Sequence, residues 1–156
     1  TSTSAYSAEG DLWLNLHIGS SHSGPGYYDQ TIDWKGNGEL NNSTAYRDYN
    51  EKNYGAGIVY EVEDFLDVRA GCYNNSVHST SLYGGGSLHS SFSNPVSVGL
   101  MLGVITGYEA ITGAALGLMA FPYASLNTKY ARIEVTYLPG IGETDSISSA
   151  SLALTF

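Results

Sequence analysis

The chain has 156 residues, the size of a single domain, and its 19 glycines and 13 tyrosines favour strands and turns over helices. Its 15 acidic residues outnumber 6 basic ones, and the net charge of −9 leaves no basic stripe to neutralise the phosphates of a nucleic acid. The lone Cys72 excludes an internal disulfide framework, and no apolar run has the length of a transmembrane helix. The chain starts with a threonine, so we expect that a secretory signal has been removed.

Apolar and polar residues alternate with a period of two along most of the chain, which predicts strands. The regular segments are Leu12–Gly19, Asn53–Asp64, Leu66–Tyr73, Val96–Ile105, Tyr130–Tyr137 and Ser149–Phe156, and the less regular ones are Ser81–His89 and Ala114–Ala124. Together they predict an all-β protein, an eight-stranded antiparallel up-and-down β-barrel of the membrane type. We expect residues 1–10, rich in serine and threonine, to form a flexible tail and residues 11–156 to form one barrel domain.

Each predicted strand has one continuous apolar face, which covers a core in a soluble protein but meets lipid in a membrane barrel. Three features favour the membrane barrel. The opposite faces carry charges of both signs that could pair in a lumen, aromatic residues fall near the ends of the apolar faces, and the chain stops on an aromatic residue. The charged residues are Glu61, Glu63, Asp67, Arg69, Arg132 and Glu134, and the aromatic ones are Trp13, Tyr54, Tyr137 and Phe156. A soluble sandwich or barrel is the alternative.

Long and short connections alternate, as this kind of barrel requires: Ser20–Glu51 is long, whereas Glu63–Phe65 and Asn127–Lys129 are short. This topology brings His17 and the run Asn74–Ser76 to the same end of the barrel.

At that end, Ser76 could act as a nucleophile with His17 as its base and Asn75 as the group that orients the ring. Ordinary turn chemistry is the competing interpretation of this Asn-Asn-Ser run. His22 and His78 lie on the same two loops and could replace His17 or form a metal pair. Scattered histidines without a ligand spacing do not predict a metal site, so we expect neither a metal nor a cofactor, and His89 is interpreted as structural.

The charged inner residues allow two interpretations. They could be paired catalytic carboxylates, or a lumen network with Arg69 and Arg132, and the network is favoured because buried charges need partners.

Small residues on the inner faces could leave a slot for substrate. Glycines at such positions, beside larger apolar side chains, could form a narrow slot for an acyl chain, or they could simply relieve crowding in a tight barrel. The residues concerned are Gly55, Gly57, Gly99 and Gly103, with Tyr73, Met101 and Ile105 on the same wall.

An ordered set of short motifs, from Leu12 to the end of the chain, resembles the lipid A palmitoyltransferases of the PagP type. The motifs are Tyr49–Gly57, Tyr73–Ser76, Val98–Thr106, Phe121–Ser125, Thr136–Gly140 and the final Phe156. The resemblance implies an outer-membrane location and membrane lipids as partners, with a palmitoyl chain moved from a phospholipid to lipid A.

The resemblance also implies that His17 is the catalytic histidine and that Asn75 and Ser76 stand where the family has an Asp-Ser pair. Asn75 departs from that pattern, because an amide can hold a histidine tautomer but cannot stabilise an imidazolium by charge. The family's N-terminal amphipathic helix has no counterpart in residues 1–10. The alternative function is a barrel without catalysis, serving as a binding, surface or structural protein, including a virion or secreted component. The oligomeric state stays open.

Overall fold

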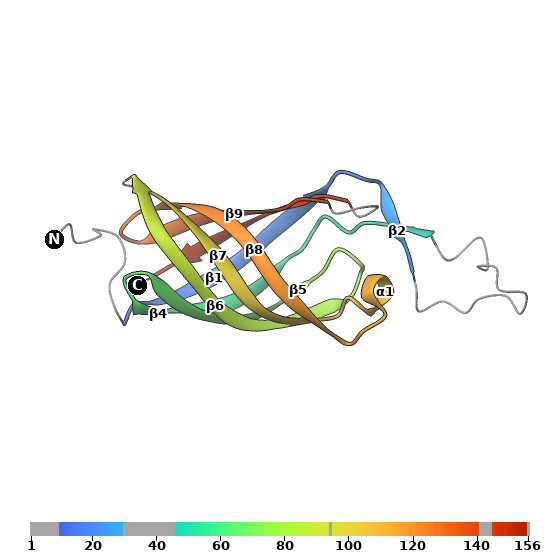
Figure 1. Cartoon of the computed structure of the whole chain (residues 1–156), viewed down its shortest axis with the longest axis horizontal. Coiled ribbons are helices and arrows are strands. Elements are labelled where there is room, and N and C mark those ends of the chain that lie inside the picture. Colours follow the sequence, from blue (N-terminus) through green and yellow to red (C-terminus); the bar gives the residue numbers. More distant parts are fainter. Residues whose placement is uncertain (1–9, 30–45, 94, 141–144, 156) are drawn as a thin grey trace, which may run out of the picture.

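The computed structural model describes residues 10–29, 46–93, 95–140 and 145–155, and it contains a closed antiparallel β-barrel (Figure 1). Eight strands close the barrel in the order β1-β10-β9-β8-β7-β6-β5-β4. Their bounds are β1 Leu12–His22, β4 Gly55–Glu63, β5 Leu66–Asn74, β6 Thr80–Ser93, β7 Val96–Thr106, β8 Leu116–Asn127, β9 Ala131–Leu138 and β10 Ile147–Leu154. Outside the barrel, β2 (Gly26–Tyr28) pairs with β3 (Tyr46–Asp48), and a one-turn helix α1 spans Glu109–Thr112.

The predicted fold class is therefore confirmed, although some boundaries differ. β1 runs three residues beyond Gly19 to His22, with an irregularity in register between His17 and Gly19, and α1 was not predicted. Predictions that fall on residues 1–9, on 30–45 and on Phe156 lie outside the described residues.

The two ends of the barrel differ, as the alternation of connections predicted. Short connections join β4 to β5, β6 to β7 and β8 to β9 at the end that also holds both chain termini (Figure 1). We call it the turn end. The opposite end, the loop end, carries α1 and the β2–β3 sheet.

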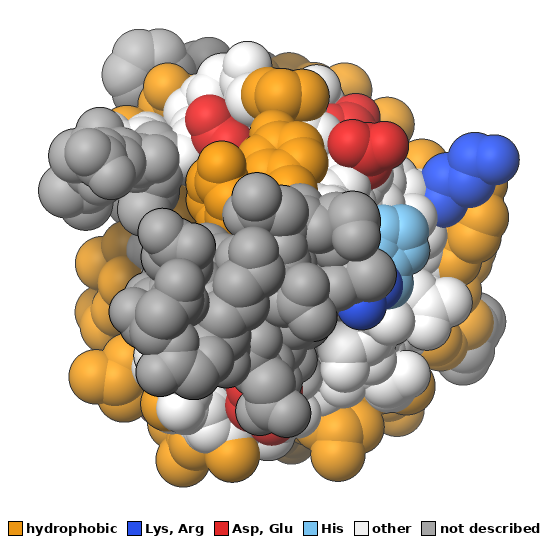
Figure 2. All heavy atoms as spheres, turned by 90° about the vertical axis from the view of Figure 1, so that its right-hand side faces the viewer, with side chains coloured by type: hydrophobic (Ala, Val, Ile, Leu, Met, Phe, Trp, Pro, Cys, Tyr) orange, Lys and Arg blue, Asp and Glu red, His pale blue; other side chains and the backbone are white. Residues whose placement is uncertain are grey.

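Apolar side chains cover the outer wall, the reverse of a soluble protein. Leu100, Leu102 and Val104 on β7 are each at least 40% exposed, and similar side chains project around the whole perimeter (Figure 2). This confirms the predicted orientation, because only a lipid environment makes such a surface favourable. No helix among the described residues has the length and hydropathy needed to cross a membrane.

Aromatic side chains flank the outer apolar band at both ends. Tyr54 and Tyr137 lie toward the loop end, as predicted, and Tyr60 and Tyr130 toward the turn end. The prediction for Trp13 was wrong: it is fully buried in the lumen, where the Arg132 guanidinium lies 4.9 Å from its ring centroid. Its position on the polar face of β1 decides this orientation, because inward and outward residues alternate.

Buried ion pairs fill the turn half of the lumen. Arg69 contacts both Asp67 (2.9 Å) and Glu134 (3.0 Å), and Arg132 contacts Glu61, with all five side chains at most 4% exposed. The favoured interpretation as a lumen network is thus confirmed for these residues.

The prediction that Glu63 joins this network was wrong. The β4–β5 register shifts between Glu61 and Glu63, and Glu63 is exposed beside the turn.

Large side chains pack together inside the barrel beside the ion pairs. Tyr83, Met101, Ile105, Met119 and Tyr123 form this buried cluster, which we call the floor. The Arg69 guanidinium lies 5.4 Å from the ring centroid of Tyr123, so apolar and aromatic side chains border the charged half of the lumen.

The network makes a stability prediction. Arg69→Met leaves Asp67 and Glu134 buried without their shared partner, so we expect the free energy of unfolding to fall by about 3–5 kcal/mol. Urea unfolding of the detergent-folded protein, followed by tryptophan fluorescence, measures this change. The control is Arg47→Met, which breaks the half-exposed pair with Asp29 (3.0 Å) and should cost less than about 1 kcal/mol. Equal losses in the two variants would contradict the role assigned to the network.

Candidate functional site

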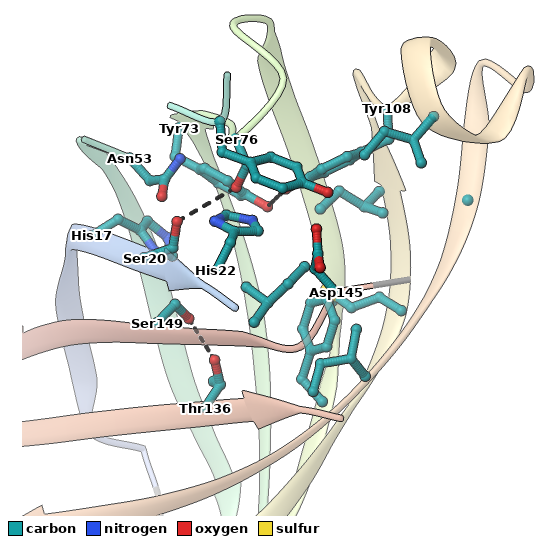
Figure 3. Close-up of a pocket in the computed structure, with 18 of the residues that line it drawn as sticks. His17, Ser20, His22, Asn53, Tyr73, Ser76, Tyr108, Thr136, Asp145 and Ser149 are labelled. Atoms are coloured by element: carbon teal, nitrogen blue, oxygen red, sulfur yellow. Dashed lines mark hydrogen bonds between the residues drawn. The ribbon is translucent and has the colours of Figure 1, made fainter. Parts of the chain in front are cut away.

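A cavity of about 670 Å³ occupies the loop half of the lumen, within the range of small-molecule sites. Its walls are mainly apolar and aromatic. Met101, Met119 and Phe121 line it near the floor, and Tyr27, Tyr49 and Tyr108 line it near the rim (Figure 3). Such a lining suits an elongated apolar ligand and offers few polar groups to orient it.

The barrel wall beside this cavity is incomplete between β8 and β9. The ladder between these strands runs only from Asn127–Arg132 to Tyr123–Thr136, whereas β8 stays paired with β7 as far as Leu116. Pro122, which has no N–H to donate, is the first β8 residue beyond the last pair. We call this opening the β8–β9 gap.

The β8–β9 gap faces the apolar outer surface. Leu116 and Leu118 on β8 are 59% and 92% exposed, and Leu118 also lines the cavity. The cavity is therefore open on the outer wall as well as at the rim. Backbone N–H and C=O groups without partners are costly in hydrocarbon unless they border a cavity. The cavity therefore explains why the unpaired edges of the β8–β9 gap are tolerated.

The segment Tyr49–Glu51 connects β1 with the β5–β6 turn at the cavity mouth. Glu51 accepts a hydrogen bond from the Ser20 backbone N–H through its own carbonyl (3.0 Å) and one from the His22 N–H through Oε1 (2.8 Å). Asn50 donates its backbone N–H to the Ser76 carbonyl (2.8 Å). These bonds bring Ser20, His22 and Ser76 to one mouth.

The two ring nitrogens of His22 differ in their contacts. Its Nδ1 lies 3.3 Å from Glu51 Oε1, its ring stacks on Tyr49 at 3.9 Å, and its side chain is fully buried. Nε2 has no hydrogen-bond partner among the described residues. A neutral histidine that donates Nδ1–H to a carboxylate presents Nε2 as an acceptor, which is the arrangement of a general base.

Two serine hydroxyls lie beside this histidine at the mouth (Figure 3). The Oγ atoms of Ser20 and Ser76 are 3.4 Å apart, and both residues line the cavity together with His22. The mouth therefore brings together hydroxyls, an imidazole and a carboxylate, the residue types that acyl transfer uses, although no hydrogen bond joins His22 Nε2 to either serine.

Tyrosine hydroxyls complete the polar part of the cavity. Tyr73 and Tyr108 share a hydrogen bond of 3.0 Å, and Tyr108 also interacts with Ser76. Burial raises the pKa of Tyr108, and burial together with the Asp145 carboxylate raises the pKa of Tyr49 to about 12. Both phenols thus remain protonated donors at neutral pH.

The three residues predicted as catalytic share the loop end, but no hydrogen bond connects them. His17 lies deeper, with Nε2 3.0 Å from the Tyr83 hydroxyl and its ring centroid 5.0 Å from that of Tyr73. Ser76 is at the mouth. Their catalytic roles stay predictions.

Asn75 is occupied by the turn between β5 and β6. Its amide nitrogen donates to Ser81 Oγ (3.0 Å) and to the Gly107 carbonyl, and its Oδ1 accepts the backbone N–H groups of Val77 and Ser79. Turn chemistry, the competing interpretation, accounts for the two bonds to Oδ1, and the amide donors connect the turn to β6 and to the residue that follows β7.

Of the residues predicted to bind substrate, Tyr73 and Met101 line the cavity, whereas the four glycines do not. Gly57 makes room for the Tyr83 hydroxyl, and a Cβ at Gly99 would lie 2.6 Å from Cζ of Tyr123. Gly55 and Gly103 abut the backbone of neighbouring strands. Relief of crowding accounts for these glycines, because tyrosine side chains fill the space beside Gly57 and Gly99 and neighbouring strands fill it beside Gly55 and Gly103.

Glu51 and Ser20, for which the sequence predicts no role, both lie at the mouth. The signal was present in Tyr49–Glu51, a motif noted only for its resemblance. If each residue of this motif is considered as a partner of the nearby histidines, Glu51 becomes a candidate.

Comparisons with known proteins support the fold alone. No family model and no curated protein matches the chain. A de novo designed transmembrane β-barrel is similar at 14% identity with a TM-score of 0.59, covering 97% of this chain and 99% of that one. A second designed protein gives 13% identity, a TM-score of 0.58 and 96% coverage of both chains. The N-terminal β-barrel domain of Pseudomonas aeruginosa OprF gives 12% identity and a TM-score of 0.53, covering 96% of this chain and all of that one. The protein therefore has the fold of small transmembrane β-barrels.

The turn around Asn75 gives a second prediction. Asn75→Asp restores the carboxylate of the resembling family but loses the amide donors to Ser81 and Gly107. We expect it to lower the free energy of unfolding by about 1–3 kcal/mol, the cost of an unmet buried polar group. Asn74→Asp, the same change at the exposed neighbouring residue, is the control and should alter stability little. A stability equal to that of the parent would contradict this account of the turn.

Proposed function

We propose that this protein is an outer-membrane barrel that takes the acyl chain of a phospholipid into its loop-half cavity and transfers the acyl group to a second lipid. The observation that carries the proposal is the opening of an apolar cavity onto the lipid-facing wall through the β8–β9 gap. A chain that leaves the bilayer through this gap passes from one apolar environment to another. The alternative function is lipid binding without transfer.

The shape of the cavity supports an acyl chain as the part that binds. The floor is largely apolar, and the walls near it carry methionine and aromatic side chains. Polar groups line the mouth, and Asn15 and Glu134 are polar residues in the deeper lining. An ester with its chain pointing toward the floor therefore has its carbonyl near the mouth. Because the chain comes from the bilayer, its transfer into the cavity is close to neutral, whereas exposure to water would cost about 0.8 kcal/mol per methylene.

The groups at the mouth support acyl transfer as the reaction. Ser76 Oγ would attack the ester carbonyl while its proton passes to His22 Nε2, directly or through the Ser20 hydroxyl. The alcohol of the donor lipid would leave with that proton, and a hydroxyl of the acceptor would then release the acyl group from Ser76 by the same steps in reverse. Glu51 would stabilise the imidazolium, which Asn75 cannot do.

Tyr108 supports the reaction as a donor to the developing oxyanion, since its protonated hydroxyl interacts with Ser76. The resemblance to the lipid A palmitoyltransferases favours lipid A as the acceptor. On this proposal His22 acts as the base, whereas the resemblance assigns that role to His17.

Lipid analysis in a host that lacks such an enzyme tests the reaction. Expression should add an acyl chain to lipid A, detected by mass spectrometry, and Ser76→Ala should lower the added product at least about a hundredfold. His22→Ala should act similarly, whereas His17→Ala should retain most activity. His78→Ala, at an exposed histidine on the same end, is the control. Bound phospholipid without any transfer in folded protein would leave the binding function and exclude catalysis.

Closing the gap tests the route. Continued beyond Tyr123–Thr136, the β8–β9 register places Ala120 opposite Pro139, and both are exposed. In a Cys72→Ala background, we expect a short bis-maleimide that joins Ala120→Cys to Pro139→Cys to lower phospholipid loading at least tenfold, measured by native mass spectrometry.

The control for this cross-link is the single variant Ala120→Cys treated with the same reagent, which should load lipid normally. Undiminished loading of the cross-linked double variant would show that lipid does not enter between β8 and β9.

A further inference from the structure

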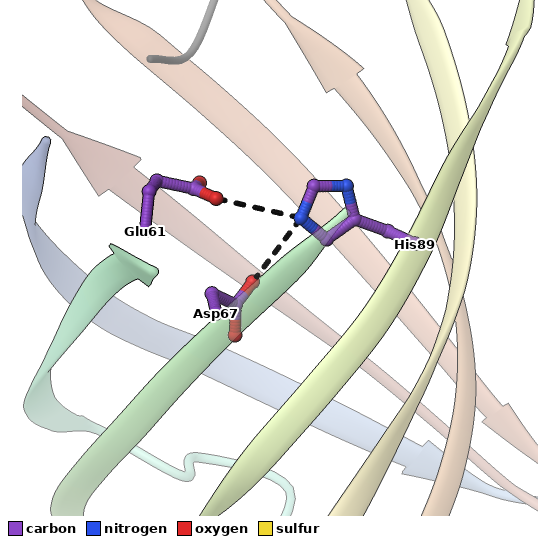
Figure 4. Close-up of side chains that lie close together, drawn as sticks. All are labelled: Glu61, Asp67 and His89. Carbon is purple, nitrogen blue, oxygen red and sulfur yellow. Dashed lines mark ion pairs between the residues drawn. The ribbon is translucent and has the colours of Figure 1, made fainter. Parts of the chain in front are cut away.

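Three potential metal ligands meet toward the turn end of the lumen, and none of them lines the cavity described above. Glu61 on β4, Asp67 on β5 and His89 on β6 direct their side chains toward one point (Figure 4). His89 Nε2 lies 3.4 Å from Glu61 Oε2 and 3.8 Å from Asp67 Oδ2, and the three atoms lie within 4.8 Å of one another. The three side chains are at most 9% exposed.

Two of these atoms lack the bonds that their burial demands. Glu61 Oε2 and His89 Nε2 have no hydrogen-bond partner among the described residues. A charge-assisted hydrogen bond between them would be about 2.7–2.9 Å long, shorter than the observed 3.4 Å. Their only mutual contact is this long ion pair, and a body placed between the two atoms would satisfy both.

The spacing fits a common ion. Zinc binds histidine nitrogen and carboxylate oxygen at about 2.0–2.2 Å, and a tetrahedron with such bonds separates its ligand atoms by roughly 3.3–3.6 Å. The distances from His89 Nε2 to the two carboxylates lie at or near this range. Three protein ligands leave one position for water.

The local charge favours a cation. Three buried carboxylates, those of Glu61, Asp67 and Glu134, face only two guanidinium groups, those of Arg69 and Arg132, among the described side chains of this network. With His89 neutral, one negative charge is left over, and a buried charge of this kind requires compensation.

The guanidinium groups also hold the two carboxylates in position. Arg69 Nε donates to Asp67 Oδ1 (3.0 Å), and Arg132 contacts Glu61 through Oε1. Arg69 Nη2 also donates to Asp67 Oδ2 (2.9 Å), so both oxygens of Asp67 are fixed, and Oδ2 retains a second lone pair for a further ligand. Glu61 keeps Oε2 without a hydrogen bond. Contacts of this kind orient the ligands of a metal, and their loss typically weakens metal binding.

We propose that Glu61, Asp67 and His89 bind a divalent transition-metal ion of the zinc class, which joins β4, β5 and β6 at the turn end. This site is independent of the proposed acyl transfer. The site was not expected from the sequence, because its ligands are widely spaced along the chain and converge only through the β4–β5 and β5–β6 registers.

Metal titration of tag-free protein in detergent tests the proposal. Protein refolded with zinc chloride and freed of excess metal should retain one equivalent, measured by mass spectrometry of the metal, and cobalt should give the visible absorption of a tetrahedral site. His89→Ala should reduce retention at least tenfold, while His78→Ala, at an exposed loop-end histidine, should not.

Folding is checked separately by the shift in gel mobility between heated and unheated samples. His89→Gln, which keeps a polar side chain of similar size, provides a second variant if His89→Ala does not fold. Because the metal is present during refolding, it can bind before the site becomes buried, so burial of the site cannot explain a lack of bound metal. The absence of retained metal in folded parent protein, or equal retention in the folded His89 variants, would overturn the proposal.

Discussion

Compensation of buried charge is the constraint on which the rest of this structure depends. A small barrel has room in its lumen for side chains but little room for water, so the carboxylates that face inward must meet guanidinium groups. Arg69 and Arg132 meet this need in the turn half of the lumen. Because most of the charges lie there, the loop half is largely apolar, and only Glu134 of this network also lines the cavity, beside Tyr83 and Met101.

A closed sheet and an open side wall are both present, in different halves of the molecule. In the turn half, all eight strands are paired, which leaves no strand edge in contact with lipid. In the loop half, the ladder between β8 and β9 ends at Tyr123–Thr136. The firmly paired half therefore holds the barrel together, and the opened half can depart from the ideal sheet where the cavity borders it.

The sequence was sufficient to predict the strands, their orientation and the end of the barrel where the site lies, because a period of two is a local property of the chain. The prediction that Trp13 lies at the bilayer interface was wrong. Its place in the alternation of β1 directs it into the lumen, whatever its aromatic character. The sequence could not decide between His17 and His22, because their partners Tyr83 and Glu51 come from distant segments. The sequence also could not reveal the β8–β9 gap. Loss of pairing between two strands does not change the alternation of apolar and polar residues within either strand.

The floor also bears on what this protein does to the membrane that holds it. Ions that enter from the loop end would meet packed aromatic and methionine side chains and then fixed charges of both signs. Side chains thus occupy much of the interior, so the cylindrical arrangement of the strands does not by itself make a channel.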